Sequence, residues 1–225
     1  MIPGRIRAAG AALFFSLALP AAAQQPPQQD AILVLDASGS MWAQIDGKPR
    51  IEIAREVVSG LLDDLPANRR LGLVAYGHSR KGDCKDIETL VDVGTDREAI
   101  RGAIREINPR GKTPMTAAVR QAAEALKYSE DPATVILVSD GIETCGLDPC
   151  AVAGTLEETG VALTVHTVGF GLGAGEQAAK AQLQCMADKT GGRFLQANDA
   201  EELAEALQEV SASASAPAPE PEPEP

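Results

Sequence analysis

The sequence predicts an α/β fold, a single doubly wound and mostly parallel sheet flanked by helices, with one antiparallel strand at its edge. Apolar runs of strand length at 31–35, 71–76, 134–139 and 161–168 alternate with segments whose apolar residues recur at helical spacing. The run at 134–139 is continuously apolar, which is typical of a strand inside a parallel sheet. With 225 residues, 44% of them hydrophobic, the chain can form one domain with terminal extensions.

The segments between these strands have helical patterns. Helices are predicted at 51–62, 96–107, 115–126, from 148 onward, 176–188 and 201–210. Asp96 and Asp148 are favourable N-cap residues, and Pro149 suits the first helical position. Two short strands, at 88–93 and 193–195, complete the sheet, and the first of these is expected to be antiparallel at its edge.

The N-terminus has the pattern of a secretory signal. Arg5 and Arg7 precede a short apolar run at 8–19 and an Ala-x-Ala site, which predicts cleavage after Ala23. The alternative is an uncleaved anchor, although the run is short for a membrane span. Residues 24–29 are predicted to be a Pro/Gln-rich spacer, 30–210 the folded domain, and 211–225 a disordered Ala/Ser/Pro/Glu tail. We therefore expect a periplasmic or secreted protein, with no transmembrane segment after signal cleavage.

The net charge excludes some partners. The whole chain has a formal charge of −12, and removal of 1–23 with its two arginines leaves 18 basic and 32 acidic residues, a charge of −14. Such a chain is a poor candidate for binding nucleic acid or anionic lipid surfaces.

The four cysteines predict two disulfides, because an even number in an exported chain favours pairing. The alternative is zinc, which the Cys145-x₄-Cys150 spacing resembles. Cys84, Cys145 and Cys150 are expected at the carboxyl edge of the sheet, and Cys185 further down a later helix. This arrangement favours Cys84–Cys145 with Cys150–Cys185 over a local Cys145–Cys150 pair.

Three segments carry oxygen side chains to that same carboxyl edge. Asp36, Ser38 and Ser40 follow the first strand, Thr113 precedes a helix, and Asp140 ends the strand at 134–139. Asp-x-Ser-x-Ser alone could equally cap a helix. Carboxylate and hydroxyl oxygens from three loops instead indicate a site for a hard divalent cation: Mg²⁺, or Mn²⁺ or Ca²⁺.

Together these residues resemble the metal-ion-dependent adhesion site of the von Willebrand factor A (vWA) domain family, and the similarity covers roughly residues 30 to 210. The resemblance implies a vWA/Rossmann-like fold in an exported bacterial protein. It implies that Ser38, Ser40 and Thr113 contact the cation, and that Asp36 and Asp140 do so directly or through water. In the family, an Asp or Glu of a protein partner completes the coordination, and the final helix shifts between affinity states in some members.

The predicted function is thus a metal-dependent protein-binding module for adhesion, interaction or assembly in the cell envelope. It is not expected to be an enzyme, because no nucleophile or general-base constellation is found. The alternative is a metal-dependent hydrolase, for which Asp83, Asp86 and Glu143 are candidate bases. A third possibility is an envelope scaffold whose metal is only structural.

Three further side chains have competing interpretations. His166 lies in an apolar strand and is expected to be structural, while His78 is interpreted as an exposed loop residue on the metal edge. Trp42 is the only tryptophan. It could pack over a turn at Asp46-Gly47 or form an aromatic platform beside the metal.

Overall fold

The computed structural model describes residues 29–213. The predicted signal peptide and most of the predicted spacer and tail lie outside this range. Within it, one six-stranded sheet has the order β5-β4-β1-β6-β7-β8. The only antiparallel pair in this described sheet is β4 with β5, at its edge. The predicted fold class is confirmed.

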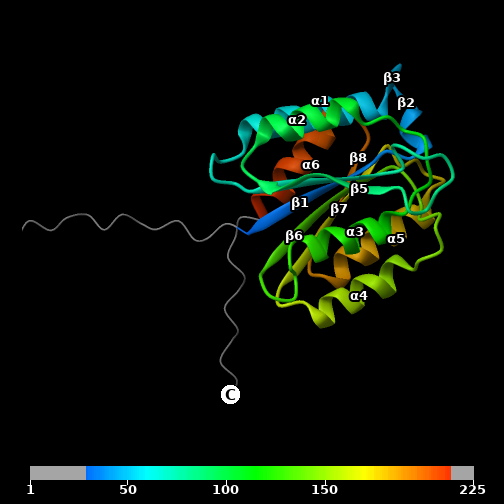
Figure 1. The fold of residues 1–225 in the computed structure, drawn as a ribbon. Coiled ribbons are helices and arrows are strands. Elements are labelled where there is room, and N and C mark those ends of the chain that lie inside the picture. The colour runs from blue at the N-terminus through cyan, green and yellow to red at the C-terminus, as the bar shows by residue number, and fades with distance from the viewer. Residues whose placement is uncertain (1–28, 214–225) are drawn as a thin grey trace, which may run out of the picture.

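The strands of this sheet and the α-helices alternate along most of the described chain, except that β5 follows β4 and α3 follows α2 (Figure 1). The sheet strands are β1 Asp30–Asp36, β4 Leu71–Tyr76, β5 Ile87–Gly94, β6 Ala133–Ser139, β7 Leu163–Phe170 and β8 Phe194–Ala197. The helices are α1 Arg50–Asp64, α2 Arg97–Glu106, α3 Met115–Ala125, α4 Pro149–Thr159, α5 Gln177–Lys189 and α6 Ala200–Ser213. The predicted caps are present, since Asp96 accepts a hydrogen bond from Ala99 N and Asp148 accepts from Cys150 N and Ala151 N.

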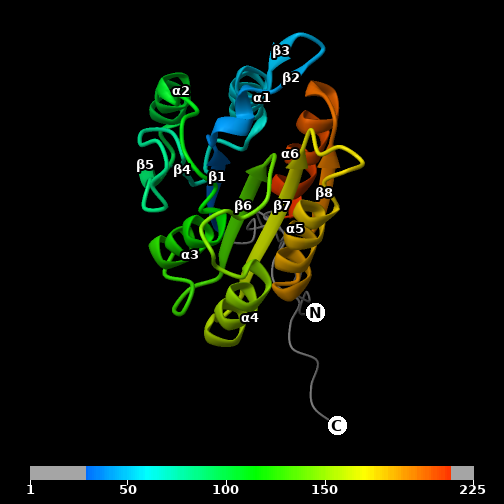
Figure 2. The same ribbon diagram turned by 90° about the vertical axis from the view of Figure 1, so that its right-hand side faces the viewer.

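Two apolar layers hold the helices against the sheet. Alternate residues of β1 point to opposite faces, so that Leu33 and Leu35 join one core cluster while Ile32 and Val34 join the other. Helices α1, α2 and α6 cover the first face, and α3, α4 and α5 cover the second (Figure 2). Because the central strands are buried on both faces, their polar groups can meet solvent only at the strand ends, where the loops begin.

Several element ends shift by one or two residues from the prediction, and a short 3-10 helix, a hairpin and a longer last helix are additional. A short hairpin pairs β2 Gln44–Ile45 with β3 Lys48–Pro49. Its turn lies at Asp46 and Gly47, which have positive φ values of 50° and 81° as a tight hairpin requires. In addition, α6 continues through Ser213, three residues beyond the expected end of the domain, with Val210 and Ser211 buried.

None of the helices within residues 29–213 combines the length and hydrophobicity needed to cross a bilayer.

Candidate metal centre

The carboxyl ends of β1 and β6 and the loop before α3 meet at one edge of the sheet. A short 3-10 helix, Gly39–Trp42, follows β1. Its Gly39 N donates to Gly111 O at 3.1 Å, and Thr144 N donates to Thr113 O at 3.1 Å. Backbone hydrogen bonds therefore connect all three segments that carry the predicted ligands.

Four of the five predicted side chains form one hydrogen-bonded set. The hydroxyls of Ser38 and Ser40 lie 2.9 Å apart, and Ser40 Oγ donates to Asp140 Oδ1 at 2.6 Å. Asp36 joins the set through its Oδ1, which accepts from Ser38 N at 2.7 Å. The structure thus brings together residues that are up to 104 positions apart, from Asp36 to Asp140.

Thr113, the fifth predicted residue, is buried and lies two residues after Gly111, whose carbonyl accepts from Gly39 N. Its backbone N donates to Thr144 Oγ1 at 2.8 Å, while its carbonyl accepts from Thr144 N. Thr144 therefore fixes the position of Thr113 from the loop that carries Asp140.

The helix-capping interpretation of Ser38 is not supported. Ser38 stands at the N-cap of the 3-10 helix, but its side chain makes no capping hydrogen bond. Its hydroxyl lies toward Ser40 instead. The alternating serines thus present oxygens to one common point rather than to the helix end.

A second line of hydrogen bonds fixes the Asp36 carboxylate from inside the sheet. Tyr76 donates to Ser139 Oγ at 3.1 Å, and Ser139 Oγ donates to Asp36 Oδ2 at 2.6 Å. Burial raises the pKa of the Tyr76 phenol well above its usual range, and the nearby Asp36 charge raises it further. The phenol therefore stays a neutral donor at this position.

The two buried aspartates oppose each other electrostatically. Burial and the negative charge of Asp36 raise the pKa of Asp140 to about 7, although hydrogen bonds from Ser40 and Arg50 lower it. The two carboxylates and three hydroxyls offer only oxygen atoms as metal ligands, which suits a hard divalent cation. Such a cation would also offset the repulsion between the two acids. No group of three or more His, Cys, Asp or Glu side chains suited to a metal occurs within residues 29–213. Any cation here would therefore depend on the hydroxyls, and the donor set fits Mg²⁺ or a similar ion.

Arg50 is the principal site residue that the sequence analysis missed. Arg50 Nη1 donates to Asp140 Oδ2 at 2.8 Å, and Nη2 donates to Gly171 O at 2.7 Å. Arg50 is also the first residue of α1, where a positive charge opposes the helix dipole. That unfavourable position was the available signal, because it indicates that a nearby acid compensates.

Glycines allow the neighbouring loops to approach this site closely. Gly77 has φ +69°, and a Cβ there would lie 2.5 Å from Lys112 O and 3.0 Å from the Ser38 backbone. A Cβ on Gly111 would lie 2.9 Å from Arg80 O. Real side chains do not tolerate such distances, so both positions require glycine.

Both predicted disulfides are present. Cys84–Cys145, with a Cα–Cα distance of 5.5 Å, joins the loop after β4 to the loop after β6. Cys150–Cys185, at 5.4 Å, joins α4 to α5. This pairing rules out the zinc alternative for these four residues, because none of the four thiols is free.

The three candidate bases of the hydrolase alternative accept hydrogen bonds from nearby backbone N–H groups. Asp86 accepts from the backbone N of Ser79 and Arg80, and Glu143 accepts from Thr116 N and Cys145 N. Asp83 accepts from Lys85 N. These contacts give all three carboxylates a role in shaping loops.

The histidines and Trp42 are also placed. His166 is buried and its Nδ1 accepts from Arg193 N, which confirms a structural role, while His78 contacts Glu88 at 3.2 Å and is mostly covered rather than exposed. Trp42 donates from Nε1 to Pro109 O at 2.9 Å and remains 46% exposed. It therefore leans toward the loop before α3 and leaves part of its ring at the surface.

Comparison with known proteins agrees with this fold. A family model described as von Willebrand factor type A domain matches residues 31–143. YwmD of Bacillus subtilis (strain 168) is 27% identical over 208 residues, covering 88% of this chain and 92% of YwmD.

Solved structures resemble it as well. Proximal thread matrix protein 1 from the mussel byssus, with a zinc-occupied MIDAS motif, superimposes with a TM-score of 0.64 at 19% identity over 84% of this chain and 46% of that one. The vWF domain of the type V pili tip protein Mfa5 from Porphyromonas gingivalis gives 0.66 at 15% identity over 83% and 94%. The sheet, its helical layers and the family match thus agree, and the chain belongs to the von Willebrand factor type A domain family.

Proposed function

We propose that this protein is a metal-dependent protein-binding module that works outside the cytoplasm, in the periplasm or after secretion. The observation that carries the proposal is the set of hydroxyl and carboxylate oxygens from three loops at one sheet edge, all of them on buried residues except the exposed Ser40. Ser38, Ser40 and Thr113 would hold a divalent cation directly, with Asp36 and Asp140 bound directly or through water. When bound, the cation would supply a positive charge. Because the hydroxyl ligands are neutral, much of that charge stays available to an incoming anion.

The partner is proposed to offer an aspartate or glutamate to this site. The surroundings favour a protein partner, because two exposed apolar side chains lie close in sequence to the ligands. Trp42 follows Ser40 by two residues and is 46% exposed, and Ile142 follows Asp140 by two residues and is 42% exposed. Exposed apolar residues beside a polar site are typical of protein interfaces.

The names of the relatives point the same way. One solved neighbour is a thread matrix protein with zinc at the corresponding motif, and another is the tip protein of a pilus. Two disulfides also suit an oxidising compartment outside the cytoplasm. These observations support interaction and export.

The decisive experiment is a pulldown from envelope extract with the purified oxidised protein, in Mg²⁺ and in EDTA. We expect specific proteins to be retained in Mg²⁺ and released by EDTA, and none to be retained by Asp36→Ala. Retention that is the same in EDTA, or the same with Asp36→Ala, would contradict the proposal.

We propose binding rather than catalysis at this centre. Phosphatase and esterase assays with Mg²⁺ or Mn²⁺ check this. Turnover that disappears in Asp36→Ala would favour the hydrolase alternative instead.

A further inference from the structure

Two loops beside the metal centre carry an excess of positive charge in an otherwise acidic chain. Together we name them the basic collar, residues 77–86 and 108–112. The collar contains five basic residues, Arg80, Lys81, Lys85, Arg110 and Lys112, and two acidic ones, Asp83 and Asp86, a net charge of +3 against −12 for the whole chain. Clustered charge of one sign creates a local potential that attracts groups of the opposite sign.

Most of this positive charge faces solvent. Arg80 pairs with Asp83 at 3.0 Å and lies 3.8 Å from Asp86, so it is largely compensated. The other four basic side chains are exposed, and none of them forms an ion pair within the described range 29–213. Arg80 offsets one of the two collar acids, so the four exposed positive charges exceed the remaining negative charge by three.

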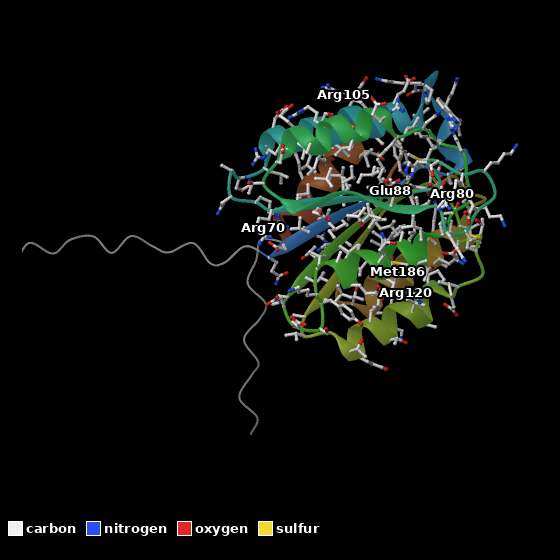
Figure 3. All side chains as sticks on the ribbon, viewed as in Figure 1. Arg70, Arg80, Glu88, Arg105, Arg120 and Met186 are labelled. Carbon is white, nitrogen blue, oxygen red and sulfur yellow. A yellow bond between two sulfur atoms is a disulfide. The ribbon has the colours of Figure 1, made fainter. Side chains whose placement is uncertain are left out.

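The backbone of the collar is fixed directly to the metal loops. Arg110 N donates to Ala37 O at 3.2 Å and to Gly77 O at 2.9 Å, and Lys112 immediately precedes Thr113. Cys84 ties the first collar loop to Cys145, in the loop after Asp140. Figure 3 shows Arg80 at one end of the sheet and Arg70 at the opposite end, which places the collar at the carboxyl edge.

A single partner carboxylate would not need these four charges. Exposed charges act over about 10 Å at 0.1 M salt, so the collar would attract further anions close to one already at the metal. We infer that the basic collar binds additional carboxylates of an acidic peptide segment whose first carboxylate occupies the metal centre. This inference rests on the proposed function and specifies its partner as a protein segment with several clustered Asp or Glu residues.

The test compares two synthetic Gly/Ser peptides, one with a single glutamate and one with three glutamates at alternate positions. Each is titrated into the oxidised protein by NMR in Mg²⁺ at low salt. We expect both to bind, with the three-glutamate peptide about five- to tenfold tighter, since each exposed ion pair adds only a small factor. That advantage should shrink toward parity at 1 M salt, where the screening length is about 3 Å.

Two triple variants make the test specific. Lys81→Ser/Lys85→Ser/Arg110→Ser removes collar charges and no proposed metal ligand. Arg105→Ser/Arg120→Ser/Lys189→Ser changes the net charge equally, using exposed residues of α2, α3 and α5. The collar variant should lose the advantage of the three-glutamate peptide and keep its affinity for the single-glutamate peptide, whereas the control variant should keep both.

Each contrary result has a distinct meaning. Equal affinities for the two peptides in Mg²⁺, or equal losses in the two variants, would overturn the inference while leaving the proposed function intact. Undiminished binding of the three-glutamate peptide in EDTA would also overturn it, because the collar would then be a general polyanion site. Failure of the single-glutamate peptide to bind in a Mg²⁺-dependent way would overturn both the inference and the proposed function.

Discussion

The interior of the sheet and its carboxyl edge bury very different side chains next to each other. Leu35 and Asp36 are adjacent in β1 and both are fully buried. Leu35 packs in an apolar layer under α1, whereas Asp36 depends on hydrogen bonds from Ser38 and Ser139 and faces the charge of Asp140. The interior is thus apolar, while the edge holds carboxylates that are costly to bury and that fit the proposed cation site.

Replacing these two neighbours should separate stability from binding most sharply. Asp36→Ala removes a proposed ligand and one of two repelling charges, so we expect no detectable Mg²⁺ binding by calorimetry and a nearly unchanged melting temperature. Leu35→Ala leaves a cavity in the core and should cost about 2–5 kcal/mol of unfolding free energy. Its folded fraction should still bind Mg²⁺ with wild-type affinity.

This pair of variants can also disprove the assignment. Mg²⁺ affinity that is unchanged in Asp36→Ala would show that the site lies elsewhere. Unfolding of Asp36→Ala to the same extent as Leu35→Ala would show that the carboxylate serves the core.

The two disulfides offer a second comparison of the same kind. Cys150–Cys185 joins two helices that already pack together, whereas Cys84–Cys145 joins two loops at the carboxyl edge of the sheet. Removing either pair as a double serine variant should lower the unfolding free energy by about 2–4 kcal/mol. Only Cys84→Ser/Cys145→Ser should also weaken Mg²⁺ binding several-fold, because it releases the loop that positions Asp140. Equal Mg²⁺ affinities in the two variants would contradict this division.

A substitution of Arg50 tests how much this arginine compensates the negative charge of Asp140 when no metal is bound. Arg50→Gln leaves the buried Asp140 without its ion pair, and should cost about 2 kcal/mol of unfolding free energy. Added Mg²⁺ should raise the melting temperature of Arg50→Gln more than that of the wild type, since the cation replaces a lost positive charge. Arg101→Gln is the control, because its partners Asp63 and Glu98 are exposed. Similar responses of both variants to Mg²⁺ would refute this role of Arg50.

An effect confined to acid pH concerns His166, a titratable group in the interior. Burial lowers the pKa of His166 to about 4, and Arg193 contributes. The folded state thus resists protonation, so the stabilisation is complete above the ordinary pKa of about 6.5 and is lost as pH falls from there toward 4. Between pH 7 and 5 this group should remove about 2 kcal/mol of unfolding free energy. In denaturant titrations, His166→Asn should lose about 2 kcal/mol less unfolding free energy than the wild type between pH 7 and 5. The same loss in both proteins would contradict this role of His166.

The strands and most helix starts could be predicted because each has a local cause. Asp96 and Asp148 cap helices through contacts two or three residues away, and the continuous apolar run of β6 follows from burial on both faces. The end of α6 was predicted three residues early. Residues 211–213 are Ser-Ala-Ser and look like the low-complexity tail, but packing that buries Ser211 extends the helix.

The grouping of the candidate ligands could be predicted from the spacing of their motif, and metal binding by them remains a proposal. Asp36, Ser38, Ser40 and Asp140 meet as expected, and both disulfides follow from where the loops and helices place their cysteines. The position of Arg50 at the start of a helix indicates an acidic partner, but the identity of that partner, Asp140, could not be predicted because it lies 90 residues away and no spacing rule connects them. Similarly, only the folded chain shows that Trp42 donates to Pro109 O.

The contacts of Gly77 and Gly111 have a consequence for how this surface can diversify. Neither position can accept a side chain without separating backbones that hold Ser38 and Lys112 in place. A combinatorial library aimed at new partner selectivity should therefore leave both glycines fixed. It should instead randomise the exposed positions Lys81, Lys85 and Arg110, whose side chains form no hydrogen bond or ion pair within residues 29–213.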